Sequence, residues 1–156
     1  MRKSSIVLLS LLVILVLAQF LRPARNKSSH DSPNDIARLH PMPEDVQTML
    51  KTACYDCHSN NTRYPWYVNI QPVGWFMASH INNGKEELNF NEYGTYSPKR
   101  QRNKLKRMKE EITKGDMPLT SYTLIHTDAK LTTTQQETIT NWIDSTLNKI
   151  DTTKSH

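Results

Sequence analysis

The sequence predicts an all-α fold. Apolar residues recur at intervals of three and four in four separate segments, which is the spacing of one face of a helix. Proline, serine or threonine stands where several of these segments begin, as helix starts favour, and no segment shows a convincing strand pattern. With 156 residues, the chain is long enough for one domain of modest size.

An apolar run opens the chain. Residues 6–21 contain only two polar residues and follow a basic start at Arg2 and Lys3. This composition predicts an export signal. Val16 and Ala18 provide the small residues that signal peptidase prefers, but no turn-forming segment separates them from the apolar run. We therefore expect the run to remain as an uncleaved membrane anchor, although it is slightly short for a spanning helix.

Composition divides the rest of the chain into three parts. Residues 22–35 are polar and rich in serine, which predicts a flexible linker after the signal or anchor segment of residues 1–21. Residues 36–150 hold the four helical segments and form the predicted domain. Residues 151–156 are polar and predict a frayed tail. The formal charge of the chain is +5, and nothing in the sequence indicates nucleic-acid binding.

The first helix of the domain leads into a motif that carries chemistry. Pro43, followed by two acidic residues, suits the first helical turn, and the helix is expected to run to the segment Cys54-Tyr55-Asp56-Cys57-His58. Cys54 and Cys57 are the only cysteines of the chain. Two cysteines three positions apart, with a histidine directly after the second, predict covalent attachment of one c-type haem. Two thioethers would tether the porphyrin, and His58 would bind the iron from one side.

Two other kinds of site use closely spaced cysteines. A thioredoxin-like redox pair lies in a βαβ unit, which the sequence does not show. A zinc site needs a second pair of ligands, and only histidines such as His40, His80 and His126 remain to supply it. Covalent haem attachment takes place outside the cytoplasmic membrane. We therefore expect the domain on the periplasmic side of that membrane.

The second helical segment offers one candidate for the far side of the iron. It is expected to span residues 73–88, and His80 lies on its apolar stripe. The loop before it is rich in aromatic residues and prolines, which predicts a rigid segment over an apolar ligand. In c-type haem proteins a proline carbonyl in this region commonly holds the second ring nitrogen of the proximal histidine, and Pro65 and Pro72 are both candidates for that role toward His58.

The third segment leads to the other candidate. Ser97 and Pro98 are expected to start a helix that Gly115 ends. Its outer faces are basic, which predicts either a solvated surface or a docking surface for an acidic redox partner or anionic lipid. Met117 stands before a proline in the loop after this helix. A thioether well downstream of the cysteine motif is expected as the distal iron ligand.

The last segment is expected to be a long helix. Thr132, Thr133 or Thr134 would cap it, and Glu137 is placed for a capping box with Thr134. His126, in the loop before it, is expected at the surface or in a hydrogen bond. The buried stripe of this helix is expected to consist of Ile139, Trp142, Ile143, Leu147 and Ile150.

Taken together, residues 36–148 resemble the haem-binding domain of exported proteins from Bacteroidetes-type bacteria, a relative of small class I cytochromes c with a single CxxCH motif. The resemblance implies a cytochrome c-like helical domain around one covalent haem c, with His58 and Met117 as ligands. It also implies that the first and last helices of the domain cross beside the haem. The matching pieces are Cys54 to Asn60, Tyr64-Pro65-Trp66, Pro72 with Trp75, His80, Leu88-Asn89-Phe90, Gly115 to Pro118, and Tyr122, His126, Ala129 and Leu131 before Trp142.

The function expected from these residues is single-electron transfer rather than catalysis. Two strong-field ligands, His58 and Met117, would leave little to reorganise when the iron changes oxidation state. The partner would be a redox protein or a membrane electron-transfer complex, with the N-terminal segment holding the domain at the membrane. The alternatives are a haem-based gas-binding or sensing module, and a peroxidase-like enzyme with His80 on the distal side.

Overall fold

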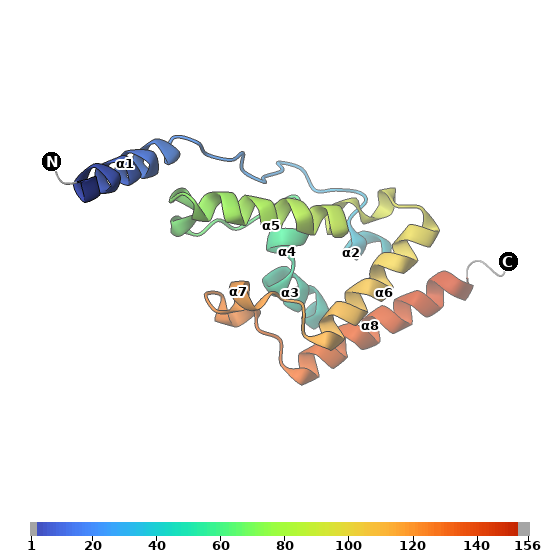
Figure 1. Ribbon diagram of the computed structural model, residues 1–156. Helices are drawn as coiled ribbons and strands as arrows, with labels where there is room; N and C mark the ends of the chain where they lie inside the picture. The colour runs from blue at the N-terminus through green and yellow to red at the C-terminus, as the bar shows by residue number, and fades with distance from the viewer. Residues whose placement is uncertain (1–2, 153–156) are drawn as a thin grey trace.

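The predicted all-α fold is confirmed. A computed structural model describes residues 3–152, and every regular element in that range is a helix (Figure 1). The longer helices are α1 (Lys3–Ala18), α3 (Glu44–Ala53), α5 (Val73–Glu87), α6 (Pro98–Lys114) and α8 (Thr133–Thr152). Short turns of helix connect them: α2 (Ile36–Leu39), α4 (Tyr55–His58), α7 (Thr120–Thr123), η1 (Trp66–Asn69), η2 (Phe90–Thr95) and η3 (Thr127–Ala129).

The four helices expected in the domain are α3, α5, α6 and α8. Pro98 is the first residue of α6, and Gly115 follows its last residue with φ of 77°, a left-handed conformation that glycine adopts at low cost. Ser97 stands at the N-cap of α6 as expected, but its side chain makes no capping hydrogen bond.

The capping box of α8 differs from the predicted one. The Thr132 amide donates to Oε1 of Gln135 at 2.8 Å, and the Gln135 amide donates to Oγ1 of Thr132 at 3.3 Å. The box therefore begins at Thr132 instead of pairing Thr134 with Glu137. The helix starts at Thr133, so Thr134 lies inside it. The Glu137 amide, which a box from Thr134 would need, is then already bonded within the helix.

The hydrophobic core lies between α3, α6 and α8. Helices α6 and α8 run side by side in opposite directions, and α3 packs against α8 (Figure 1). The first and last helices of the domain pack together as expected, because their apolar stripes share one buried cluster. Its members include Val46, Leu50, Leu105, Met108, Ile112, Ile139, Trp142, Ile143 and Leu147, with Met49 packed against it.

Helix α5 lies against the cysteine motif. A Cβ atom added at Gly84 would stand 2.7 Å from the Cys57 carbonyl oxygen, so only glycine permits this approach of α5 to α4. The close packing carries the backbone after α5 directly past His58.

The N-terminal apolar run forms α1, which extends away from the domain (Figure 1). Among residues 3–152, no helix is long and apolar enough to cross a membrane. The 16 residues of α1 would span about 24 Å at 1.5 Å per residue, against a hydrocarbon core of about 30 Å. The expectation of a membrane-spanning anchor is therefore not met by this helix. Arg2 of the predicted basic start lies outside the described residues.

The segment 22–35, predicted as a flexible linker, makes specific contacts with the domain. The Asn26 side chain donates to the Ser59 carbonyl at 2.8 Å and to Oγ1 of Thr62 at 2.9 Å. Its carbonyl oxygen accepts from Nζ of Lys85 at 2.8 Å. In the predicted tail, residues 151–152 continue α8, and residues 153–156 lie outside the described range.

Candidate haem site

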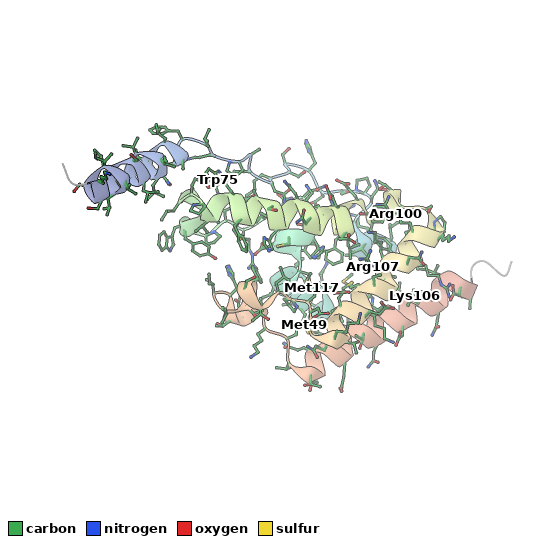
Figure 2. The ribbon with its side chains drawn as sticks, viewed as in Figure 1. Met49, Trp75, Arg100, Lys106, Arg107 and Met117 are labelled. Carbon is green, nitrogen blue, oxygen red and sulfur yellow. The ribbon has the colours of Figure 1, made fainter. Side chains whose placement is uncertain are left out.

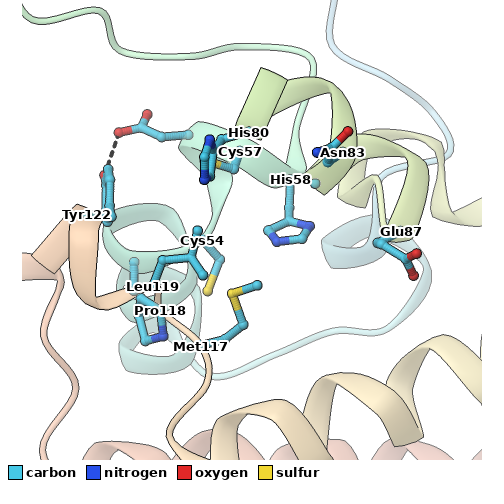
Figure 3. Close-up of a pocket in the computed structure, with 13 residues that line it drawn as sticks. Cys54, Cys57, His58, His80, Asn83, Glu87, Met117, Pro118, Leu119 and Tyr122 are labelled. Carbon is cyan, nitrogen blue, oxygen red and sulfur yellow. Dashed lines mark hydrogen bonds between the residues drawn. The ribbon is translucent and has the colours of Figure 1, made fainter. Parts of the chain in front are cut away.

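The cysteine motif occupies one turn of helix behind α3. Helix α3 ends at Ala53, Cys54 breaks the helical geometry with φ of −127°, and α4 then carries the remaining four residues of the motif. The His58 amide donates to the Cys54 carbonyl at 3.0 Å, which keeps both cysteines and the histidine within a single turn. Cys54, Cys57 and His58 all border one cavity (Figure 3).

A backbone carbonyl orients His58. Its Nδ1 lies 2.9 Å from the Leu88 carbonyl oxygen, and because a carbonyl can only accept, Nδ1 carries the proton. Burial lowers the pKa of His58 below its ordinary value, which favours the neutral ring. Nε2 then holds a free electron pair, the form in which histidine binds a metal. The carbonyl comes from Leu88 and not from Pro65 or Pro72, because α5 ends at Glu87 and brings the following residue beside the motif.

Two neighbouring cavities meet at His58. They have volumes of about 160 Å³ and 180 Å³ and share Cys54, His58, Glu87 and Met117 in their walls. We call them the cysteine cavity, which Cys57 borders, and the α6 cavity, which α6 borders. The walls of both cavities are mostly apolar. Ala53, Pro118 and Leu119 contribute to the wall of the cysteine cavity, and Leu88, Phe90, Met108 and Ile112 to that of the α6 cavity.

Met117 projects into this space from the loop between α6 and α7 (Figure 3). The amides of Asp116 and Met117 both donate to the Glu111 carbonyl, at 3.0 and 3.2 Å, so the loop turns tightly after Gly115. Met117 borders both cavities, as His58 and Cys54 do. The thioether expected from the sequence is thus brought to the same space as the cysteine motif.

His80 also reaches the site, but from one side only. It borders the cysteine cavity and not the α6 cavity. Its Nδ1 donates to the Phe76 carbonyl at 2.9 Å within α5, and its ring centroid lies 4.1 Å from that of Phe76. His80 is therefore held against its own helix.

The two thiols are half-buried and free. No disulfide joins Cys54 and Cys57. Burial raises the pKa of Cys54 to about 12 and that of Cys57 to about 11. Both groups are therefore neutral thiols at neutral pH, in keeping with the low polarity of the cavity walls.

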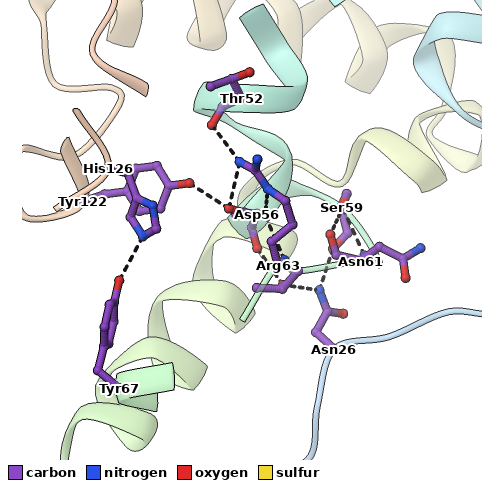
Figure 4. Close-up of polar contacts among 10 residues, drawn as sticks. Asn26, Thr52, Asp56, Ser59, Asn61, Arg63, Tyr67, Tyr122 and His126 are labelled. Atoms are coloured by element: carbon purple, nitrogen blue, oxygen red, sulfur yellow. Dashed lines mark hydrogen bonds and ion pairs between the residues drawn. The ribbon is translucent and has the colours of Figure 1, made fainter. Parts of the chain in front are cut away.

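A buried carboxylate inside the motif was missed by sequence reasoning. Asp56 is only 5% exposed, and its Oδ1 accepts from the Arg63 amide at 2.9 Å and from Nε of Arg63 at 3.3 Å (Figure 4). Its Oδ2 accepts from the Tyr122 hydroxyl at 2.7 Å. The only signals in the sequence are an arginine seven residues after the aspartate and a tyrosine five residues after Met117.

The contacts of Asp56 continue through His126. The ring of His126 stacks on Tyr122 at 4.4 Å between centroids, and its Nε2 lies 2.9 Å from the Tyr67 hydroxyl (Figure 4). The expectation that His126 takes part in a hydrogen bond is confirmed. The network links α4, α7 and η1, and its members Asp56 and Tyr122 border the cysteine cavity.

These residues fit a haem. The space is flanked by walls of low polarity, two free thiols border it, and a histidine with an available Nε2 and a methionine thioether face it from different elements. Such donors suit iron in a porphyrin. Among residues 3–152, no group of three or more histidine, cysteine or acidic side chains could hold a metal ion by itself, and the zinc interpretation gains no ligand set.

Comparison with known proteins agrees with this site. A family model described as a haem-binding domain matches residues 13–145, and the chain belongs to this family. The match begins within α1 and includes residues 22–35. No curated protein and no solved structure matches the chain.

Proposed function

We propose that the chain is an exported c-type haem protein that transfers single electrons. Cys54 and Cys57 would form the two thioethers, His58 would be the proximal ligand and Met117 the distal ligand. The observation that carries this proposal is the position of Met117, which borders both cavities together with His58 and Cys54.

The haem would supply a one-electron couple, and the residues of this chain would set its properties. The Leu88 carbonyl fixes the tautomer of His58 and raises the basicity of Nε2. The thioether of Met117 favours the reduced iron relative to a second imidazole. The apolar walls of the cavities would exclude water and favour the oxidation state in which the haem carries less charge.

Export is part of the same proposal. Thioethers form from free thiols, and neither cysteine is in a disulfide. The apolar residues of α1 supply the composition of an export signal, which would deliver the domain to the periplasmic side of the cytoplasmic membrane. The electron partner would be a redox protein or a membrane electron-transfer complex.

Absorption spectroscopy tests the proposal. The full chain is expressed with haem-maturation machinery as wild type, Met117→Ala and His80→Ala. The wild type is expected to keep its colour after extraction with acidified organic solvent, because the haem is covalent. Only Met117→Ala is expected to lose the weak far-red band of methionine-ligated ferric haem. Colour that is extracted, or a far-red band that only His80→Ala removes, would contradict the proposal.

A second function has one observation in its favour. His80 borders the cysteine cavity, where it could serve as a distal group in gas binding or in peroxidase-like chemistry if Met117 leaves the iron. Rapid carbon monoxide binding by the reduced wild type would support gas binding. Turnover of hydrogen peroxide that depends on His80 would support the enzyme.

A further inference from the structure

The α6 cavity has one charged edge. Lys104 and Arg107 of α6 border it, together with Glu87 at the end of α5 and Glu111. The remaining wall near this edge is apolar, formed by residues such as Phe90 and Ile112. The charged edge therefore holds two cations beside two carboxylates. A cavity that is apolar in its interior and offers two cations at one edge suits a flat apolar ligand that carries carboxylates on one side.

Both cations converge on a single carboxylate oxygen. Nη1 of Arg107 lies 2.8 Å from Oε2 of Glu87, and Nζ of Lys104 lies 3.7 Å from the same atom. The Lys104 side chain is only 13% exposed, whereas those of Arg107 and Glu87 are 59% and 60% exposed. Glu111 makes no ion pair with either cation in the described part of the chain. A largely buried ammonium with one long ion pair has capacity for a better anionic partner.

The two cations and Cys57 border different cavities. Cys57 borders the cysteine cavity only, Cys54 borders both cavities, and Lys104 and Arg107 border the α6 cavity only. In a c-type haem the two thioethers and the two propionates lie at opposite edges of the porphyrin. The cations thus stand at the part of the site that lies away from Cys57.

Other basic residues of α6 do not face the site. Lys106 borders an open groove between α6 and α8, and the guanidinium of Arg100 lies 4.5 Å over the Tyr96 ring. Figure 2 shows Arg107 toward the loop of Met117 and Arg100 near the start of α6. Of the basic residues of α6, Lys104 and Arg107 therefore border the cavity, and the others lie outside it.

We propose that Lys104 and Arg107 bind the propionate carboxylates of the haem, and that Glu87 holds the two cations in place until the haem takes over that role. This inference rests on the proposed function, since covalent attachment at the cysteines defines which edge of the haem meets α6. Glu87 is exposed enough to turn into solvent when the propionates replace it. The two propionate carboxylates would then take the place of the Glu87 carboxylate beside Lys104 and Arg107.

The test uses the matured full-length protein. The double variant Lys104→Met/Arg107→Met removes both cations and shortens the Lys104 side chain by only one atom. Arg100→Met/Lys106→Met is the matched control, with the same change of net charge on the same helix. Two quantities are measured: the midpoint potential, and the propionate bending band in resonance Raman spectra, which responds to hydrogen bonds at the propionates.

The first pair of substitutions is expected to favour the ferric form by about tenfold, which corresponds to a fall of about 59 mV for a one-electron couple, and to shift the propionate band. The control is expected to change neither by a comparable amount. An unchanged band in the Lys104/Arg107 variant, or equal shifts in both variants, would overturn the inference.

Two safeguards keep the outcome interpretable. If the double variant does not mature, the single variant Arg107→Met gives the same readouts, because that side chain is exposed and the fold does not depend on it. Wild-type protein that carries no covalent haem would contradict the proposed function. Coloured wild type with an unaffected Lys104/Arg107 variant would contradict only the assignment of the propionates.

Discussion

The Tyr122 hydroxyl donates a 2.7 Å hydrogen bond to Oδ2 of Asp56, across 66 positions of sequence. Asp56 lies between the two cysteines, and Tyr122 lies five residues after Met117. The bond therefore connects the element that would tether the haem to α7, the helical turn directly after the loop that would supply its distal ligand. Because Asp56 is buried and charged, this is a stronger contact than a hydrogen bond between neutral groups.

Removing this hydroxyl is expected to destabilise the protein. Tyr122→Phe deletes one hydrogen bond to a charged group, which costs about 1.5–3 kcal/mol. Chemical unfolding of the matured protein measures the loss, and the far-red band reports whether the proposed ligation by Met117 persists. The control is Tyr93→Phe, because the Tyr93 hydroxyl is buried and has no hydrogen-bond partner among residues 3–152. That variant is expected to be neutral or slightly more stable, and equal losses in the two variants would contradict the role of the Asp56 contact.

Gly84 is expected to tolerate no side chain. Gly84→Ala places a methyl group 2.7 Å from the Cys57 carbonyl oxygen, and the backbone must shift to relieve it. Overpacking of this kind costs about 1–3 kcal/mol. Asn82→Ala changes an exposed position of the same helix and is expected to leave the melting temperature within a few degrees of wild type. Thermal unfolding with unaltered stability in Gly84→Ala would show that α5 and α4 are packed less closely than this contact implies.

The thiols of haem-free protein are expected to react slowly. The pKa values of Cys54 and Cys57 are raised by burial from 9.0 to about 12 and about 11. Because the thiolate is the nucleophile, alkylation at pH 8 should be at least roughly 100-fold slower than in denaturant, and should accelerate about tenfold per pH unit. Mass spectrometry of iodoacetamide adducts follows both rates.

The same shifts fix the sign of a pH effect on stability. The fold favours the neutral thiols, so their contribution is complete below pH 9 and declines as the pH rises through about 11 and about 12. Cys54→Ser/Cys57→Ser protein should lack this decline. Equal alkylation rates in folded and denatured wild type would show that the thiols are accessible.

The core between α3 and α8 supplies a fifth prediction. Ile143 is fully buried in the main cluster, whereas Ile150 packs at its margin. Ile143→Ala is expected to lower the free energy of unfolding by about 2–5 kcal/mol, and Ile150→Ala by less than half as much. Denaturant titration compares the two. A larger loss at Ile150 would place the core nearer the end of α8.

Much of this architecture could be predicted from local signals. Helical spacing located α3, α5, α6 and α8, and five adjacent residues of the cysteine motif were enough to indicate the kind of ligand. Pro98 and Gly115 marked both ends of α6 because each acts through its own backbone geometry. These features depend on residues close together in the sequence.

Features that depend on tertiary contacts could not be predicted. The partner of His58 is a carbonyl 30 residues away, and any residue type can provide a carbonyl. The ion pairs of Lys104 and Arg107 with Glu87 join α6 to α5, and the composition of α6 alone does not separate them from its outward-facing cations. The apolar run was long enough to suggest an anchor, but its helix ends at Ala18.

Asn26 has a practical consequence for the design of shorter fragments. Its amide group and backbone bind the turn that follows His58, through Ser59, Thr62 and Tyr64. A recombinant product that starts at residue 36, the boundary that composition alone indicates, would leave those partners exposed to water beside the cysteine motif. Expression plasmids for crystallisation or NMR should therefore retain the chain from before Asn26 onward.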